Sequence, residues 1–419
     1  MRQSYLKNAA LLTVSDVALR LAGMGLRIYL ANALGGEGMG LYQLVLAVYS
    51  LFVTLATSGV SVASTRLMAE ELACSRPRAR GMLARLCGVA LALGLAAMAG
   101  QWCLAGPAAR WWLGDVRGAR ALRAAALGMP FMAVASVLRG FFIARGQVGP
   151  NVASQLAEQA FRIGVMVAAL EATEGLDVGT RCAVVLGATA AGEALSAALM
   201  AVFCRRAAPE AFGHDRAQAP QAAGRRIWEI LWPVEGGRCL ASALHTAENM
   251  LVPACLAVYL GQRSTALAQY GTLKGMALPL VNFPFGLLGS LGVLLMPEIT
   301  RAHIRANRPR LTSLLRRMLR LTVYFSAFVG MVFWVWGQPL GLVLYGSREA
   351  GAYLEILAPA LPLLYLESMV DNAMKGIGEQ RAAFRYSVWD SMLRIGAVVL
   401  LLPRQGMRGF LLVLSLIHI

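Results

Sequence analysis

Long apolar segments alternate with short polar loops along the whole chain. An apolar helix of about 20 residues crosses a hydrocarbon core of about 30 Å. Twelve segments fit this description or approach it: 9–31, 41–63, 82–105, 121–143, 152–171, 181–204, 228–257, 266–296, 314–337, 351–371, 383–402 and 409–419. The pattern predicts an all-α polytopic membrane protein. The last segment is too short to span, so we expect a truncated twelfth helix.

The second half of the chain repeats the first. Residues 130–167 and 362–399 match without a gap at an offset of 232, with Arg162 opposite Arg394. An earlier set of matches has an offset of 228 and pairs Tyr42 with Tyr270, Met68 with Met296 and Glu70 with Glu298. In an apolar chain, such duplication is typical of transporters whose two halves enclose a central path.

The repeat predicts a division of the chain into three parts. Residues 1–204 would form an N-terminal lobe of six transmembrane helices, and residues 228–419 a C-terminal lobe of six more. Residues 205–227, rich in Arg, Ala, Pro and Gln, would link them on the cytoplasmic side. We therefore expect two pseudo-symmetric six-helix lobes around a central cavity.

Composition supports the membrane class, and charge predicts an orientation. The chain is 58% hydrophobic with a mean hydropathy of +0.59. The net charge of +17 could suggest nucleic acid. However, with the N-terminus placed in the cytoplasm, 24 of the 39 Lys and Arg residues fall in inner loops and 9 in outer ones. This asymmetry follows the positive-inside rule, and it favours anionic lipids over nucleic acid as partners. One outer loop disagrees, since it carries Arg110, Arg117, Arg120 and Arg123.

No motif for catalysis or metal binding is present. The seven cysteines and four histidines lack metal-ligand or disulfide spacing, and no phosphate-binding or nucleophile motif occurs in a strand–turn–helix context. The longest connection, 205–227, has no room for a soluble catalytic domain. We expect neither enzymatic activity nor a cofactor or bound metal.

Charges within the apolar segments are costly, so they indicate candidate functional residues. Arg20 and Arg27 lie seven residues apart in the first segment and therefore share one helical face. Two cations on one face suit a cavity that receives an anion such as a lipid phosphate. In the alternative, Asp16 pairs with Arg20 and Arg27 extends to the membrane surface.

The seventh segment contains helix-breaking residues beside charges. Pro233, Gly236 and Gly237 predict a broken helix that serves as a hinge or gate. Glu235 and Arg238, spaced i,i+3, would pair beside the break. Arg238 could also contact substrate.

Further charged residues within the apolar segments are Glu248 and two pairs of opposite charge. Glu248 could neutralise an arginine of the opposite lobe or carry a coupling ion. Glu158 with Arg162, and Asp390 with Arg394, are spaced i,i+4 at matching positions of the repeat. Because each carboxylate has a cation one turn away, we interpret both pairs as structural.

The eighth segment is rich in proline and glycine. Pro279 and Pro284 should bend this helix, and Gly286, Gly289 and Gly292 would let another helix approach closely. We expect the two prolines to act as hinge residues, although static packing would use the same residue types.

Three stretches resemble a known family. They are GGEGMGLYQLVLAVYSLFVTLATSGVSVASTRLMAEE (35–71), YGTLKGMALPLVNFPFGLLGSLGVLLMPEITRA (270–302) and ALRLAGMGLR (18–27). They look like the stage V sporulation protein B branch of polysaccharide exporters. That branch belongs to the multidrug/oligosaccharidyl-lipid/polysaccharide flippase superfamily, which also contains the peptidoglycan lipid II flippase MurJ.

The resemblance implies a fold, an activity and a site. It implies two six-helix lobes around a V-shaped cavity that move a lipid-linked sugar by alternating access. By matching position, Arg20 and Arg27 correspond to cavity arginines of the lipid II flippases, and Arg238 and Glu248 match a cavity-facing seventh helix more loosely. The substrate class would be an undecaprenyl-pyrophosphate-linked saccharide, such as a peptidoglycan precursor.

Other functions remain open on the sequence. A multidrug or cation antiporter of the same fold would require acidic residues in the first lobe, and a glycan polymerase would require a large outer loop. A non-transporting scaffold would leave the arginines unexplained. We expect a monomer in the cytoplasmic membrane, with coupling to Na⁺, H⁺ or the membrane potential as the open alternatives.

Overall fold

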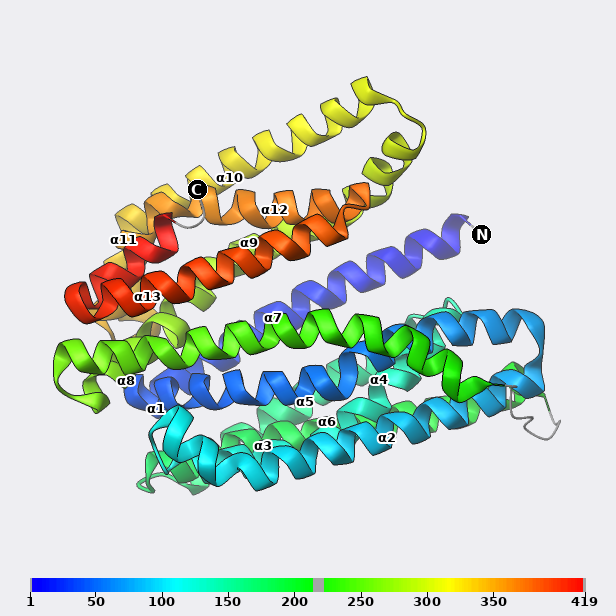
Figure 1. The fold of residues 1–419 in the computed structure, drawn as a ribbon, viewed down its shortest axis with the longest axis horizontal. Helices are drawn as coiled ribbons and strands as arrows, with labels where there is room; N and C mark the ends of the chain where they lie inside the picture. The colour runs from blue at the N-terminus through cyan, green and yellow to red at the C-terminus, as the bar shows by residue number, and fades with distance from the viewer. Residues whose placement is uncertain (1, 214–221, 417–419) are drawn as a thin grey trace. The chain divides into compact units, whose positions relative to one another are not determined.

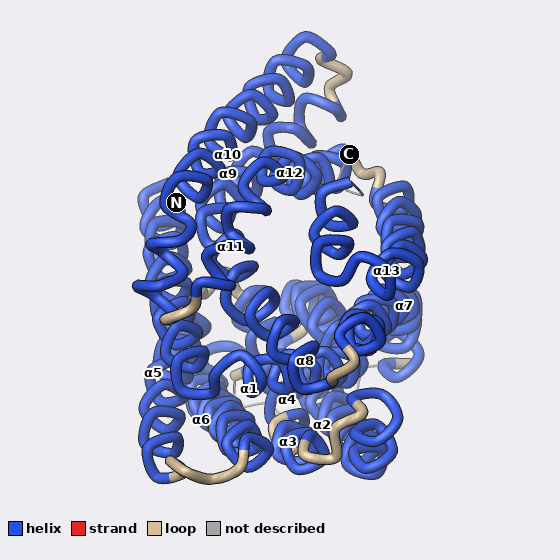
Figure 2. Tube along the Cα trace, turned by 90° about the vertical axis from the view of Figure 1, so that its left-hand side faces the viewer, coloured by secondary structure: helices blue, strands red, loops and turns tan. Residues whose placement is uncertain are grey.

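The computed structural model describes residues 2–213 and 222–416, and in these ranges all regular structure is helical (Figure 2). This confirms the all-α prediction. In chain order the elements are α1 (Arg2–Cys74), α2 (Arg76–Pro107), η1 (Ala108–Leu113), α3 (Gly118–Ala126), α4 (Met129–Ala144), α5 (Gly149–Ala172), α6 (Val178–Phe212), α7 (Ala223–Leu260), α8 (Arg263–Gly271), η2 (Thr272–Ala277), α9 (Leu278–Ile304), α10 (Arg308–Tyr345), α11 (Arg348–Leu357), η3 (Ala358–Ala360), α12 (Leu361–Ile377) and α13 (Gln380–Leu416).

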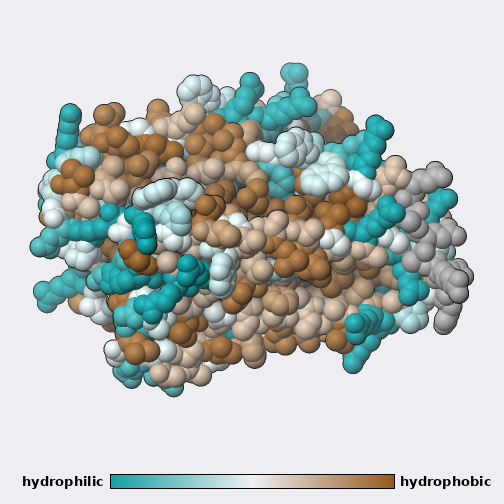
Figure 3. All heavy atoms as spheres, turned by 60° about the horizontal axis from the view of Figure 1, so that its bottom comes forward, coloured by the Kyte–Doolittle hydropathy of each residue, from teal (hydrophilic) through white to brown (hydrophobic). Residues whose placement is uncertain are grey.

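The helices have the length and composition of membrane spans. Seven helical stretches within the described residues are long and apolar enough to cross a bilayer. The first, Ser15–Cys74, contains the predicted segment 41–63 and most of the predicted segment 9–31. On the face shown in Figure 3, apolar side chains cover most of the middle, and hydrophilic ones gather mainly toward the two ends. Both observations agree with a polytopic membrane protein. The count of twelve spans stays a prediction.

Two glycines divide long helices. Gly35 interrupts α1 with φ 68°, between the predicted segments 9–31 and 41–63. Gly406 interrupts α13 with φ 60°, just before the predicted segment 409–419. Residues with a Cβ atom rarely adopt such positive φ angles, so glycine is needed where the chain changes direction.

The chain forms two compact units, Met1–Leu19 with Leu44–Thr246 and Arg20–Gln43 with Ala247–Ile419. In the first unit, α2 packs against α3 and α4, and α6 packs against α3, α4 and α5 (Figure 1). In the second unit, α10 packs against α9, α11 and α12. Part of α1 thus belongs to the second unit and the start of α7 to the first. The lobe boundaries 1–204 and 228–419 stay predictions. Residues 214–221, in the middle of the predicted linker 205–227, lie outside the described residues.

In the second unit, α1 crosses α8 at glycines. A Cβ on Gly40 would overlap the backbone carbonyl oxygen of Leu267, and one on Gly271 would overlap that of Gly36. Gly36 and Gly40 form a G-x-x-x-G pair, the spacing that lets helices in membranes approach until their backbones touch.

Gly40→Ala is expected to destabilise the protein by about 1–3 kcal/mol, because the added methyl group must push the two backbones apart. Denaturant or thermal unfolding of the purified protein would measure the change. Gly88→Ala is the matched control, since a Cβ on Gly88 meets nothing within 4 Å. Equal stability of the two variants would contradict the close crossing.

Ion pairs neutralise two of the arginines that disagreed with the charge rule. Arg117 lies 2.7 Å from Asp115, and Arg120 lies 3.0 Å from Asp177. Asp177 also caps α6, accepting a hydrogen bond from the Thr180 backbone at 3.1 Å. Hydrogen bonds from Thr180, and then the nearby Arg120, hold the pKa of the Asp177 carboxyl below its usual value. These arginines therefore have a local structural role.

Candidate functional site

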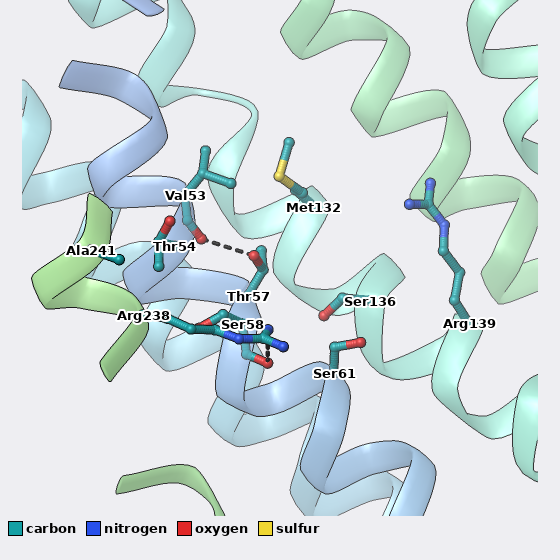
Figure 4. A pocket seen from close by; sticks show the side chains of 10 residues that line it. All are labelled: Val53, Thr54, Thr57, Ser58, Ser61, Met132, Ser136, Arg139, Arg238 and Ala241. Atoms are coloured by element: carbon teal, nitrogen blue, oxygen red, sulfur yellow. Dashed lines mark hydrogen bonds between the residues drawn. The ribbon is translucent and has the colours of Figure 1, made fainter. Parts of the chain in front are cut away.

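A polar cavity of about 550 Å³ lies within the first unit, formed by α1, α4 and α7 (Figure 4). Two of its lining residues are arginines and five carry hydroxyl groups. The full lining is Val53, Thr54, Thr57, Ser58, Ser61, Met132, Ser136, Arg139, Arg238 and Ala241. No carboxylate is among them. The cavity therefore combines hydrogen-bonding groups with positive charge.

Helical periodicity places these side chains on common faces. Thr54, Ser58 and Ser61 follow one another at i, i+4 and i+7 along α1. Ser136 and Arg139 occupy one face of α4 in the same way. The hydroxyl stripe and the arginine within an apolar segment were visible in the sequence, but our sequence analysis did not use them.

Three of the cavity's five hydroxyl groups donate to carbonyl groups of their own helices, whereas Ser58 Oγ donates to Glu235 of α7. Thr57 Oγ1 donates to the Val53 carbonyl at 2.8 Å, Thr54 Oγ1 to the Ser50 carbonyl at 2.8 Å, and Ser136 Oγ to the Ala133 carbonyl at 2.7 Å. A hydroxyl oxygen retains lone pairs when its proton is used in this way. These side chains can therefore accept hydrogen bonds from hydroxyl groups of a ligand.

Side chains that do not line the cavity hold the Arg139 guanidinium in place. Its Nη2 donates to Glu158 Oε2 at 3.0 Å and to Ser196 Oγ at 2.7 Å. Glu158 also lies 3.8 Å from Arg162, so the expected i,i+4 pair is formed. Arg139, on another helix, is a second cation that pairs with the same carboxylate. Such bracing limits the rotamers of a long side chain and fixes the direction of its charge.

Arg238 lines the cavity, and its neighbour Glu235 has other partners. Arg238 Nη1 donates to the Ser58 carbonyl at 3.4 Å. Glu235 accepts hydrogen bonds from the Gly59 backbone at 2.6 Å and from Ser58 Oγ at 2.8 Å. The expected pairing of Glu235 with Arg238 is therefore wrong. Glu235 instead fastens α7 to α1 behind the cavity.

The proline- and glycine-containing segments remain helical. α7 is continuous through Pro233, Gly236 and Gly237, so the predicted break is not observed. α9 is likewise continuous through Pro279 and Pro284, after the π-helical turn η2. Their role as hinges stays a prediction.

Glu248 lies in a buried ionic cluster of the second unit. Its side chain is 1% exposed and lies 3.7 Å from Arg394, which also bonds to Asp390. The expected i,i+4 pair of Asp390 and Arg394 is thus formed. Arg394 belongs to the same unit as Glu248, so this pair does not link the two units. The two roles expected of Glu248, neutralising an arginine of the opposite lobe and carrying a coupling ion, stay predictions.

Arg20 and Arg27 are exposed on the part of α1 that belongs to the second unit. Arg20 lies against α9, since a Cβ on Gly286 would be 2.5 Å from its Nη1 atom. Glycine at position 286 therefore leaves room for the guanidinium. The structure thus brings Arg238 and Arg139 together in one unit and places Arg20, Arg27 and Glu248 in the other. Their roles in binding stay predictions.

The family described as polysaccharide biosynthesis protein matches residues 5–220, which is more than half of the chain. The chain belongs to this family. A relative in the polysaccharide biosynthesis protein family is stage V sporulation protein B of Bacillus subtilis (strain 168). It is 24% identical over 410 residues, covering 97% of this chain and 79% of the relative. This confirms the resemblance seen in the sequence.

Solved structures confirm the fold of this member of the polysaccharide biosynthesis protein family. An inward-facing multidrug resistance MATE transporter of the MOP superfamily has a TM-score of 0.75 at 12% identity, covering 97% of this chain and 94% of that one. The lipid II flippase MurJ in an inward closed conformation has a TM-score of 0.73 at 11% identity, covering 97% and 84%. The apolar helices and the fold together make the protein a multi-pass membrane protein with the fold of these transporters.

Proposed function

We propose that this protein flips a saccharide linked to undecaprenyl pyrophosphate across the cytoplasmic membrane by alternating access. The observation that carries the proposal is the cavity of the first unit, lined by Arg139, Arg238 and five hydroxyl side chains. Membership in the polysaccharide biosynthesis protein family supports the same substrate class. A peptidoglycan precursor or another envelope glycan precursor has the required chemistry.

The cavity's chemistry is complementary to both polar parts of such a substrate. Guanidinium groups bind phosphate oxygens through paired, charge-assisted hydrogen bonds. The oxygens of Thr57 and Ser136 can accept hydrogen bonds from sugar hydroxyls. A cationic drug fits less well, because the lining residues carry two positive charges and no carboxylate.

Arg20 and Arg27 form a separate cationic face in the second unit. Seven residues apart and exposed on one helix, they suit a pyrophosphate during part of the transport cycle. We propose that Arg139 and Arg238 bind the pyrophosphate in one step of the cycle and that Arg20 and Arg27 bind it in another. Glu248 would then support the second unit through Arg394.

Reconstitution tests this function. Purified protein in proteoliposomes should move a fluorescent lipid-linked saccharide between leaflets without cleaving or extending it. Cells lacking the protein should accumulate the precursor in the cytoplasmic leaflet. Proton- or sodium-driven drug efflux without glycan flipping would instead favour a multidrug antiporter. A longer glycan after incubation with an activated donor would identify an enzyme.

We also propose that the N-terminus is cytoplasmic. A reporter fused at 301–313 is expected to report cytoplasm, and one fused at 173–179 the outside, because basic loops stay on the cytoplasmic side during insertion. Reporter activity and accessibility to a membrane-impermeant thiol reagent would measure this. A cytoplasmic signal from 173–179 would refute the proposed orientation.

A further inference from the structure

A second cavity, outside the proposed transport site, lies at the turn between α9 and α10. Its volume is about 270 Å³, and its lining consists of Glu298, Arg301, Ala302, Arg305, Asn307 and Arg310. Three guanidinium groups thus surround a space with one carboxylate. Glu298 lies 3.6 Å from Arg310, which leaves two arginines in excess.

The turn holds these arginines close together although their charges repel. Arg301, in the last turn of α9, and Arg305, which caps this helix at its C-terminal end, are four residues apart, a spacing at which like charges repel each other. The chain then reverses through Ala306, whose φ of 51° is unusual for a residue with a side chain. Asn307 caps α10 by accepting a hydrogen bond from the Arg310 backbone at 3.1 Å. An anion in the cavity would relieve this repulsion.

Comparison of the two repeats shows that this cluster is an addition in the second half. The sequence Arg-Pro-Arg begins α2 at 76–78 and α10 at 308–310, at the offset of 232. Glu70 and Glu298, just before it, match at the offset of 228. The second copy is therefore four residues longer here, about one helical turn. This longer stretch contains both Arg301 and Arg305.

The first copy is organised differently at the equivalent place. There Glu70 and Glu71 are both present, and Arg226 of α7 forms ion pairs with both. In the second copy Ile299 replaces the second carboxylate, and among the residues that line the cavity the ion pair joins Glu298 to Arg310 and not to Arg301 or Arg305. The two turns thus share a motif, and at the second turn it borders a cavity lined by more arginines than carboxylates.

We propose that this cavity binds one phosphate group, presented by an acidic lipid headgroup or by a soluble phosphate. Its volume is below the range of about 300–1,000 Å³ typical of sites for larger organic ligands, so a phosphate fits better than a saccharide. Its position favours a lipid as the source, because α10 is a candidate membrane span that begins at Arg308. Arginine clusters at such positions bind the phosphates of acidic lipids. The proposal does not depend on the transported substrate.

Native mass spectrometry of the delipidated full chain tests the site. Dioleoyl phosphatidylglycerol is added to the wild type, to R301Q/R305Q and to R316Q/R317Q. The last variant is the matched control, since it removes two exposed arginines of α10 that do not line the cavity. We expect R301Q/R305Q to weaken the tightest lipid-binding event at least about tenfold and the control to weaken it less than twofold. Equal losses in both variants, or no loss in either, would overturn the proposal.

Two further experiments identify the ligand and exclude misfolding as the cause of weaker lipid binding. Glu298→Gln removes the only lining carboxylate and should tighten phosphatidylglycerol binding several-fold, a gain that misfolding cannot produce. Unchanged or weaker binding to this variant would contradict the site. Glycerol 3-phosphate and dioleoyl phosphatidylcholine are tested as probes in parallel. Binding of glycerol 3-phosphate assigns a soluble phosphate, selective binding of phosphatidylglycerol assigns the lipid, and equally tight phosphatidylcholine binding argues against a charge-selective site.

Discussion

Flipping of a lipid-linked saccharide is expected to fall by about 10- to 100-fold when Arg139 is replaced by glutamine. The change removes a charge-assisted hydrogen bond to the substrate, which contributes about 1.5–3 kcal/mol. Glutamine can still bond to Ser196, so the surrounding helices should stay packed. Initial rates of leaflet exchange in proteoliposomes, at equal amounts of inserted protein, measure the effect.

Arg145→Gln is the control for this experiment. Arg145 follows directly after α4, the helix that carries Arg139, and its side chain is 11% exposed. It forms an ion pair with Glu210 and lies over the ring of Phe141, and it is not among the residues that line the cavity. Its replacement should affect stability more than transport. Arg139→Lys separates charge from geometry, since lysine cannot grip a phosphate with two parallel hydrogen bonds. Normal flipping by both Arg139 variants would refute the role of this cavity in transport.

Glu248→Ala is expected to lower the free energy of unfolding by about 3 kcal/mol, the loss typical of removing one partner from a buried ion pair. Glu248 is 1% exposed, and its removal takes one carboxylate away from Arg394, whose side chain is 13% exposed. Thermal or denaturant unfolding of the purified protein measures the effect. Glu298→Ala should change stability by less than about 0.5 kcal/mol, because Glu298 is 49% exposed.

The same variants distinguish the two functions proposed for Glu248. A structural role predicts a loss of stability, with transport falling only as far as folded protein is lost. If Glu248→Ala keeps wild-type stability and loses its response to a Na⁺ or H⁺ gradient, Glu248 carries the coupling ion and the structural interpretation is wrong. Measuring both stability and gradient dependence on one preparation decides between them.

Local patterns predicted local features well. Glu158 with Arg162 and Asp390 with Arg394 form the expected pairs, because residues four apart meet on any helix regardless of what surrounds it. The helix break that we expected near Pro233 is not observed, because the effect of a proline depends on the surroundings of its helix. A proline in a membrane helix can be accommodated when neighbouring helices and side chains satisfy the freed backbone groups.

Partners between helices were not predictable in the same way. Glu235 bonds to Gly59 across 176 residues, and Arg139 meets Ser196 across 57. A spacing of three residues suggested Arg238 as the partner of Glu235. In the folded protein the backbone N–H of Gly59 is available to it, because a glycine leaves space for the carboxylate.

The sequence by itself determined the class of this protein: an all-α membrane protein with an internal repeat. Its apolar segments are long enough to cross a bilayer, and only helices satisfy their own backbone hydrogen bonds there without joining other segments. Only the tertiary structure decided which polar side chains share a cavity. α1 and α4 each present a polar stripe and α7 presents Arg238, and helical periodicity fixes these side chains on their helix but not the neighbour that they face. Packing of the first unit brought Thr57, Ser136 and Arg238 to one cavity, because polar side chains that line a shared cavity stay out of lipid.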